Sequence, residues 1–117
     1  MAGVTFPRRG EIYWVGLDPT IGSEIAKTRP AVIISNDIGN QYSARVIVAP
    51  ITSGGRARVY PFEVPVQAGE GGLAQDSKVL LDQIRTVDKA RLRQRIGALP
   101  AARLLAVDQA IRLSLAV

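Results

Sequence analysis

Two residue types are missing altogether from this chain of 117 residues, namely cysteine and histidine. Without cysteine there is no disulfide bond, no thiol nucleophile and no thiolate ligand for zinc or an iron–sulfur cluster. Without histidine there is no imidazole base, no imidazole metal ligand and no Ser-His-Asp triad. The candidates that remain for a functional site are Arg, Lys, Asp, Glu, Ser, Thr and Tyr side chains, and we expect no cofactor.

Long hydrophobic runs are also missing. Although 47% of the residues are hydrophobic, no stretch reaches the roughly 18 apolar residues that a membrane-spanning helix needs. Residues 1–9 lack the apolar stretch of a secretory signal. We expect a cytoplasmic protein with no membrane partner, and the length predicts a single domain over residues 1–117.

The charge that is present is mostly arginine. The net charge is +5, and twelve of the fifteen basic residues are arginine. The planar guanidinium binds phosphate through two hydrogen bonds and stacks on bases, so this balance favours a nucleic-acid partner. Many basic proteins bind no nucleic acid, and composition alone leaves both interpretations open.

Short β-branched and apolar segments alternate with turn residues over the first 99 positions. We predict strands at 12–15, 30–35, 45–51, 59–64, 77–81 and 95–99, turns at 36–37 and 67–75, and one helical turn within 87–92. Pro61 favours a sheet edge or bulge for the fourth strand. Segment 18–28 is a polar loop longer than the usual connection, which is typical of functional or mobile segments.

The hydrophobic period changes after Pro100. Leu104, Val107, Ile111 and Leu115 recur at helical spacing, which predicts an amphipathic C-terminal helix of about fourteen residues. Strands followed by one helix favour a mainly β domain, in which a small, strongly bent antiparallel sheet or partly open barrel is capped by that helix.

Aromatic residues are few, and two of them lie next to each other in the first predicted strand. Tyr13 and Trp14 could stack on bases, but aromatic residues in such a strand more often belong to the core. We expect core positions for both.

Polar groups gather in three segments. In 22–30, Glu24, Lys27 and Arg29 lie where the long loop meets a buried strand. In 50–56, the hydroxyl groups of Thr52 and Ser53 lead into a glycine turn, where hydroxyls and backbone N–H groups can hold phosphate oxygens. The alternatives are a solvated loop for the first segment and ordinary turn residues for the second.

The third polar segment is 80–89. There a buried strand runs into Asp82 and Gln83, whose side chains can read the edges of bases. The five cations that follow are Arg85, Lys89, Arg91, Arg93 and Arg95. The alternative for this charge run is a solvated face.

These segments resemble the motifs of the MazF/PemK-type toxins. The resemblance is carried by 9–15 (RGEIYWV), 17–20 (LDPT), 22–24 (GSE), 27–37 (KTRPAVIISND), 48–53 (VAPITS), 60–64 (YPFEV) and 81–88 (LDQIRTVD). It implies an SH3-like small barrel of the CcdB/PemK-like type and a homodimer. It also implies a sequence-specific, metal-independent endoribonuclease that acts on single-stranded RNA as the toxin of a toxin–antitoxin module, inhibiting translation and growth.

The resemblance also assigns residues. The family's catalytic arginine corresponds to Arg29, its catalytic threonine to Thr52 and its loop glutamate to Glu24, and its base-contacting pair corresponds to Asp82 and Gln83. With their polar neighbours, the RNA-binding candidates are Ser23, Lys27, Thr28, Ser53, Asp82, Gln83 and Arg85.

RNA supplies its own nucleophile, the 2′-OH, so a site without histidine can suffice. We expect Arg29 to bind the scissile phosphate and protonate the leaving 5′-oxygen, while Thr52 donates to a phosphate oxygen. The products would be a 2′,3′-cyclic phosphate and a 5′-OH. Because free arginine has a pKa above about 12, the general base stays open between Glu24, a perturbed Arg29 and water.

The expected partners are mRNA, with rRNA and tRNA as further candidates, and an antitoxin whose acidic, partly disordered tail competes with RNA. DNA is expected only through the antitoxin. Two alternatives remain: a nucleic-acid-binding module without catalysis, and a gyrase-poisoning toxin on the same fold. The intact motifs at 27–30 and 51–53 argue against the second.

Overall fold

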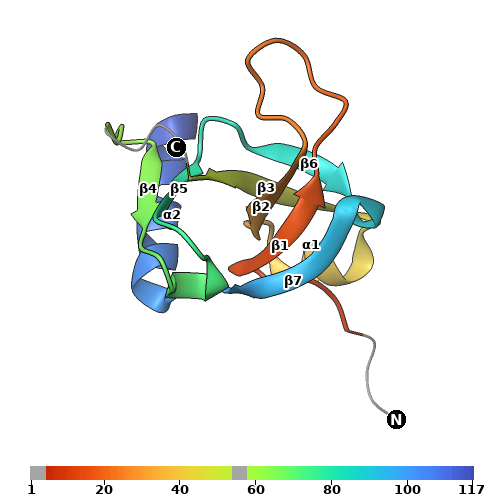
Figure 1. The fold of residues 1–117 in the computed structure, drawn as a ribbon. Helices are drawn as coiled ribbons and strands as arrows, with labels where there is room; N and C mark the ends of the chain where they lie inside the picture. Colours follow the sequence, from red (N-terminus) through yellow and green to blue (C-terminus); the bar gives the residue numbers. More distant parts are fainter. Residues whose placement is uncertain (1–4, 54–57) are drawn as a thin grey trace.

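The structure is a computed structural model that describes residues 5–53 and 58–117. Over these ranges the chain forms a mainly β domain with a C-terminal helix (Figure 1). The elements are β1 (Glu11–Gly16), β2 (Thr28–Ile33), α1 (Asp37–Tyr42), β3 (Arg45–Thr52), β4 (Glu63–Val66), η1 (Glu70–Gly72), β5 (Ser77–Leu80), β6 (Arg85–Asp88), η2 (Lys89–Arg91), β7 (Leu92–Ala98) and α2 (Ala101–Leu115). The predicted fold class is confirmed.

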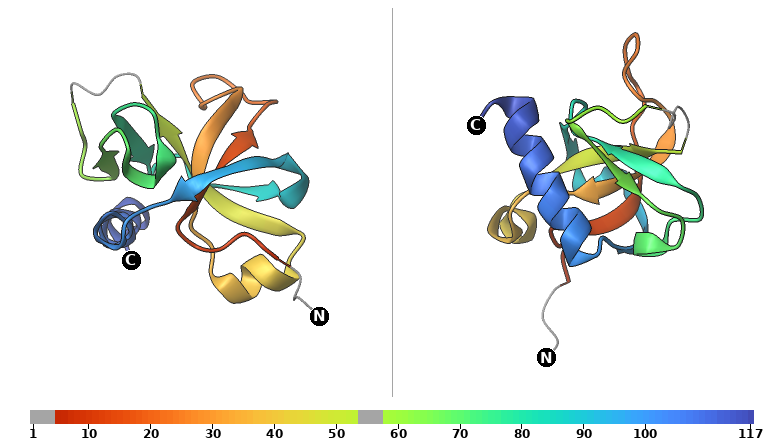
Figure 2. Two further views of the ribbon diagram at one scale, coloured as in Figure 1. Left: turned by 60° about the horizontal axis from the view of Figure 1, so that its bottom comes forward. Right: turned by 90° about the vertical axis from the view of Figure 1, so that its left-hand side faces the viewer.

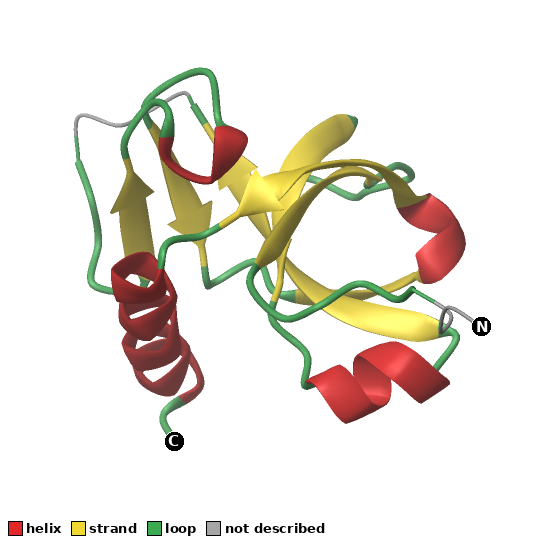
Figure 3. Cartoon of the chain, turned by 90° about the horizontal axis from the view of Figure 1, so that it is seen from below, coloured by secondary structure: helices red, strands yellow, loops and turns green. Residues whose placement is uncertain are grey.

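The strands form one bent antiparallel sheet in the order β4-β5-β3-β2-β1-β7, with β6 also paired to β3. The sheet is not closed, since β4 and β7 lie at its two ends. It curls strongly along its length (Figure 3). Pro61 precedes β4, and this strand lies at the sheet edge as predicted.

Strand β3 changes partners along its length. Its first half pairs with β6 through Arg45–Val48, and its last two residues, Ile51 and Thr52, pair with β5. Pro50 lies between the two stretches and has no N–H to donate, so it suits the point where one partner strand ends and the next begins. The end of β3 is thereby directed away from β6 and toward the segment around β5.

Two hydrophobic clusters occupy opposite faces of β1 and β2. Ile12 and its partner Val32 belong to one cluster, and Val15 belongs to the other. Tyr13 packs against the second cluster, as expected for a core position. Trp14 does not follow the prediction, because it is 41% exposed. It shares the face of Ile12 but lies beyond the end of the cluster, where this face opens into a pocket.

Helix α2 confirms the C-terminal prediction. Val107 and Ala110 are its buried residues and belong to the first cluster, and the helix lies beside β4 on one side of the sheet (Figure 2). Of the helices in the described part of the chain, none is long and apolar enough to cross a membrane.

Helix α1 corrects the prediction of a turn at 36–37. Asn36 caps this helix, its Oδ1 accepting from the backbone N–H of Gly39 at 2.7 Å. The amide of the buried Asn40 donates to the carbonyl of Ser35 at 2.8 Å. A single short turn of helix carries too little hydrophobic period to be recognised from its residues alone.

Several strand boundaries differ from the prediction, and one strand was not predicted. β2 spans Thr28–Ile33, two residues earlier at each end than expected. β4 begins at Glu63 instead of 59, because the N–H of Glu63 closes a turn on the carbonyl of Tyr60 at 2.9 Å. β6 was not predicted, although the helical turn expected within 87–92 is present as η2. β7 begins at Leu92, three residues before the predicted strand, because its long pairing with β1 overrides the polar composition of 93–95.

Candidate active site

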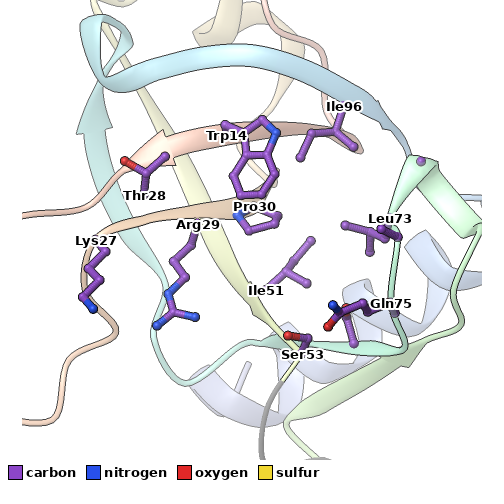
Figure 4. Close-up of a pocket in the computed structure, with 13 residues that line it drawn as sticks. Trp14, Lys27, Thr28, Arg29, Pro30, Ile51, Ser53, Leu73, Gln75 and Ile96 are labelled. Carbon is purple, nitrogen blue, oxygen red and sulfur yellow. Dashed lines mark hydrogen bonds between the residues drawn. The ribbon is translucent and has the colours of Figure 1, made fainter.

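A pocket of about 510 Å³ opens where β1, β2 and β3 meet the segment that precedes β5. Its lining is of three kinds (Figure 4). Lys27 and Arg29 lie on one side. Trp14 and Pro30 lie together at the top, and the polar side chains of Ser53 and Gln75 lie at the bottom. The pocket thus combines positive charge, an aromatic ring and hydrogen-bonding groups.

Arg29 reaches the pocket from the start of β2. It pairs with Val15 of β1, and its Nε donates to the carbonyl of Ala26 at 3.1 Å. Because this bond uses Nε, the remaining guanidinium N–H donors are those of Nη1 and Nη2. Pro30 follows directly and restricts Arg29 to an extended backbone. The guanidinium is therefore held half-buried at the pocket edge, where it can face an anion.

The residue before this strand has an unusual backbone. Lys27 has a φ of +70°, in the left-handed region that residues other than glycine seldom adopt. Its N–H donates to Oδ1 of Asp18 at 3.0 Å, and its carbonyl accepts from the N–H of Leu17 at 2.9 Å. These two bonds close the base of the long loop, which projects from the sheet (Figure 1). They stabilise the strained residue and fix the entry into β2.

Thr52 and Ser53 lie at the end of β3. Ser53 lines the pocket, whereas Thr52 is half-buried and pairs with Lys78 of β5. Gly54, Gly55 and Arg56, which continue this polar segment in the sequence, lie outside the described residues.

A buried ion pair lies beside Thr52. Nζ of Lys78 is 2.9 Å from Oε1 of Glu63, and the two side chains are 9% and 7% exposed. The same Nζ donates to the carbonyl of Arg58 at 3.1 Å. This pair links β4 to β5 behind the end of β3. The sequence analysis did not predict this ion pair. A lysine within the apolar run 77–81 could have indicated it, because a charge in a buried strand needs a partner of opposite charge.

A second cleft, of about 440 Å³, lies between the long loop and the segment that joins β5 to β6. Its lining shares no residue with the first pocket and includes four predicted site residues: Glu24, Asp82, Gln83 and Arg85. The Glu24 carboxylate accepts from the N–H of Ile21 at 2.6 Å. Glu24 is therefore turned onto its own loop and does not line the pocket of Arg29.

The predicted RNA-binding residues thus fall into separate groups. Lys27, Thr28 and Ser53 line the first pocket with Arg29. Asp82, Gln83 and Arg85 line the second cleft with Glu24. Ser23 is exposed on the loop and lines neither.

Gln83 and Arg85 bind the protein's own backbone. Oε1 of Gln83 accepts from the N–H of Ile25 at 2.8 Å, and Nη1 of Arg85 donates to the carbonyl of Leu17 at 2.9 Å. Arg91, from the same basic run, donates to the carbonyl of Gly16 at 3.1 Å and also to that of Asp18. These side chains hold the two ends of the long loop in place.

Two titratable side chains outside both clefts have shifted pKa values. Burial raises the pKa of Tyr13, and the neighbouring Glu11 adds to the rise. The backbone N–H of Arg9 donates to the carboxylate of Asp37 at 2.7 Å and lowers the pKa of Asp37. In residues 5–53 and 58–117, no three or more Asp and Glu side chains gather in a way that could hold a metal ion.

Comparison with known protein families decides the assignment. Residues 8–115 match the family described as PemK-like, MazF-like toxin of type II toxin–antitoxin system. The chain belongs to this toxin family. The family predicted from the motifs is confirmed, and the match includes both clefts and the loop between them.

Individual members of the toxin family agree with this assignment. The endoribonuclease MazF of Staphylococcus epidermidis is 44% identical over 108 residues, covering 92% of this chain and 90% of the relative. The endoribonuclease EndoA of Bacillus subtilis is 42% identical over 110 residues, covering 94% and 95%. The crystal structure of MazF from Deinococcus radiodurans is similar with a TM-score of 0.82 and 30% identity, covering 97% of this chain and all of that one (100%).

Proposed function

We propose that this chain is an endoribonuclease toxin that cuts single-stranded RNA at short sequence motifs without a metal ion. Two relatives more than 40% identical over more than nine tenths of the chain are named endoribonucleases. The observation that carries the proposal is the first pocket, in which Arg29 lies with Lys27 and Ser53 beside an apolar wall. A phosphate bound by the cations leaves the neighbouring base within reach of that wall.

The protein has mainly to position the RNA, because the RNA supplies its own nucleophile, the 2′-OH. The 2′-oxygen attacks the adjacent phosphorus, the bond from phosphorus to the 5′-oxygen breaks, and the products carry a 2′,3′-cyclic phosphate and a 5′-OH. The guanidinium of Arg29 stabilises the added negative charge and donates a proton to the leaving oxygen. Thr52 does not line the pocket, so it donates a hydrogen bond to the phosphate only if the end of β3 adjusts when RNA binds.

The proton of the 2′-OH passes to water or to Glu24. Glu24 faces the second cleft and accepts from Ile21, so it serves as the base only if the loop rearranges when RNA binds. The Glu24→Gln variant separates the two: a large loss of kcat assigns the role to Glu24, and a small one assigns it to water.

The protein partners follow from the toxin family. We propose an antitoxin with an acidic, partly disordered segment that occupies the basic pocket and competes with RNA, and a homodimer as the active unit. DNA is bound only through that antitoxin, and the cytoplasm is the site of action.

The test is cleavage of a long unstructured RNA in EDTA, with mapping of cut sites and chemical analysis of the ends. We expect discrete cuts at one short motif, and a loss of about 100- to 1,000-fold in rate for Arg29→Ala, the range found when one group that stabilises developing charge is removed. The control is Arg112→Ala, which removes the same charge from an exposed position on α2.

Three outcomes contradict the proposal. Cutting that stops in EDTA and returns with Mg²⁺ contradicts the metal-free reaction. An unchanged rate in Arg29→Ala contradicts the assignment of this residue. Binding without any cleavage identifies a nucleic-acid-binding module.

A further inference from the structure

Trp14 is the only tryptophan in the chain, and it is 41% exposed although it lies in the middle of a strand. Its Cα partner on β2 is Pro30, so both side chains project from the same face of the sheet. Figure 4 shows the indole beside the proline ring at the top of the pocket, with the rest of its surface facing the pocket interior. The large aromatic face is thus presented to a ligand.

The wall next to the indole is apolar. Ile51 and Leu73 belong to the first hydrophobic cluster, and Ile96 packs against it. All three line the pocket, and Figure 4 shows Leu73 on the side away from Lys27. The pocket volume of about 510 Å³ lies within the usual range for small-molecule sites, about 300–1,000 Å³. A flat, largely apolar group fits such a site better than a phosphate does.

Hydrogen-bonding groups lie at the other end of the pocket. The Gln75 side chain is directed into it beside Ser53 (Figure 4). The hydroxyl of the buried Ser77 donates to the carbonyl of Gln75 at 2.8 Å, which fixes the backbone at this point. A primary amide donates two hydrogen bonds and accepts others, so Gln75 is suited to read the edge of a base.

The segment that carries Leu73 and Gln75 is held against β7. Gly72 has a φ of +82°, and a Cβ at this position would lie 2.6 Å from the carbonyl oxygen of Ile96. The N–H of Gly69 donates to the carbonyl of Leu73 at 2.7 Å. The pocket wall is therefore formed before any ligand arrives.

We propose that this pocket holds one unpaired nucleobase of the RNA, stacked on Trp14, with its edge toward Gln75 and its phosphate toward Arg29. The inference rests on the proposed ribonuclease function and adds the element of sequence preference to it. Unpaired bases are recognised by stacking on aromatic rings and by hydrogen bonds at their edges, and the pocket supplies both beside a cation. Binding of the phosphate backbone alone requires neither the indole nor the amide.

The test uses the fluorescence of the only tryptophan. The ligand is a 2′-fluoro RNA of mixed sequence, which lacks the 2′-OH and cannot be cut. An abasic oligonucleotide of the same length keeps the phosphates and lacks the bases. We expect the RNA to quench Trp14 in a saturable manner, and the abasic chain to leave its emission unchanged.

The outcomes separate this inference from the ribonuclease function. Cleavage of ordinary RNA without any change in Trp14 emission on binding overturns the base pocket and leaves the ribonuclease intact. Quenching by the 2′-fluoro RNA without cleavage of ordinary RNA supports the pocket and contradicts the ribonuclease. Equal quenching by the abasic chain also overturns the base pocket.

Variants give a second readout. Removal of one base–aromatic stack costs about 1–3 kcal/mol, or roughly 5- to 150-fold in binding, so Trp14→Ala should lower kcat/KM by a factor in this range while Trp14→Phe stays close to the parent. Gln75→Ala should change the preferred base next to the cut. Tyr42→Ala, which removes an exposed aromatic ring from α1, is the matched control and should leave both unchanged. Equal activity of Trp14→Ala and the parent overturns the proposal.

Discussion

The two clefts that contain the predicted site residues are held together in different ways. The first pocket lies on strands, and its walls are fixed by backbone pairing, a buried ion pair and close glycine contacts. The second cleft lies under a long loop that Gln83, Arg85 and Arg91 hold by hydrogen bonds to its backbone. Strand pairing makes a rigid wall, whereas a segment held by a few side-chain hydrogen bonds opens at a lower cost in free energy. We therefore expect the first pocket to be the more rigid of the two.

The largest expected effect concerns the ion pair on the rigid side. Lys78→Ala leaves the Glu63 carboxylate buried without its cation, and breaking a buried pair in this way costs about 3–5 kcal/mol of unfolding free energy. Chemical denaturation measures this loss. The double variant Lys78→Met with Glu63→Leu removes both charges and should recover most of the stability. A single variant as stable as the parent would show that the pair does not hold β4 to β5.

A smaller loss of stability is expected at Gly97, where the backbone of β7 touches the backbone of segment 69–75 beside the first pocket. A Cβ at Gly97 would lie 2.3 Å from the carbonyl oxygen of Gly71, so Gly97→Ala must push the segment 69–75 away from β7. Overpacking of this kind costs about 1–3 kcal/mol, which thermal unfolding measures.

Gly39→Ala is the matched control for this substitution. Gly39 lies inside α1, and its Cβ would make only ordinary contacts, the nearest at 3.4 Å. There alanine should stabilise by about 0.5–1 kcal/mol. A Gly97→Ala variant as stable as the parent would contradict the close contact at Gly97.

The smallest effect is expected on the loop side. Gln83→Ala removes the acceptor of the Ile25 N–H, and one such hydrogen bond contributes about 1 kcal/mol. The hydrogen-exchange rate of the Ile25 amide should therefore rise several-fold. The midpoint of global unfolding should not move appreciably. Gln83→Glu keeps an acceptor and should exchange like the parent. A large drop in global stability for Gln83→Ala would show that the loop and the pocket unfold together, and the contrast between the two clefts would disappear.

Much of the fold could be read from the residues. The β-branched runs at 30–35 and 45–51 predicted two strands, and the helical period after Pro100 predicted a helix. All three elements are present, although β2 spans Thr28–Ile33 and so begins and ends two residues earlier than predicted. Helix α1 and strand β6 escaped prediction because both are short, with 6 and 4 residues, and short elements carry little periodic signal.

The sequence predicted which residues belong to the candidate site but not how these residues are arranged in space. Arg29, Lys27 and Ser53 do line one pocket, because all three lie at or next to the end of a strand that the pattern predicts. Glu24 and Gln83 were expected to face RNA, and the structure places them in the other cleft, with hydrogen bonds to the loop. Nothing local to residue 83 indicates that its acceptor meets the amide of residue 25.

The sequence by itself therefore determined the family, the strands and final helix, and the cation at Arg29, because hydrophobic period and motif spacing are properties of neighbouring residues. Only the tertiary structure decided that Trp14 faces a pocket instead of the core, that Arg85 and Arg91 hold a loop, and that Lys78 is buried with Glu63. Each of these depends on a segment far along the chain, and a side chain's exposure and partners are set by the segments that fold against it.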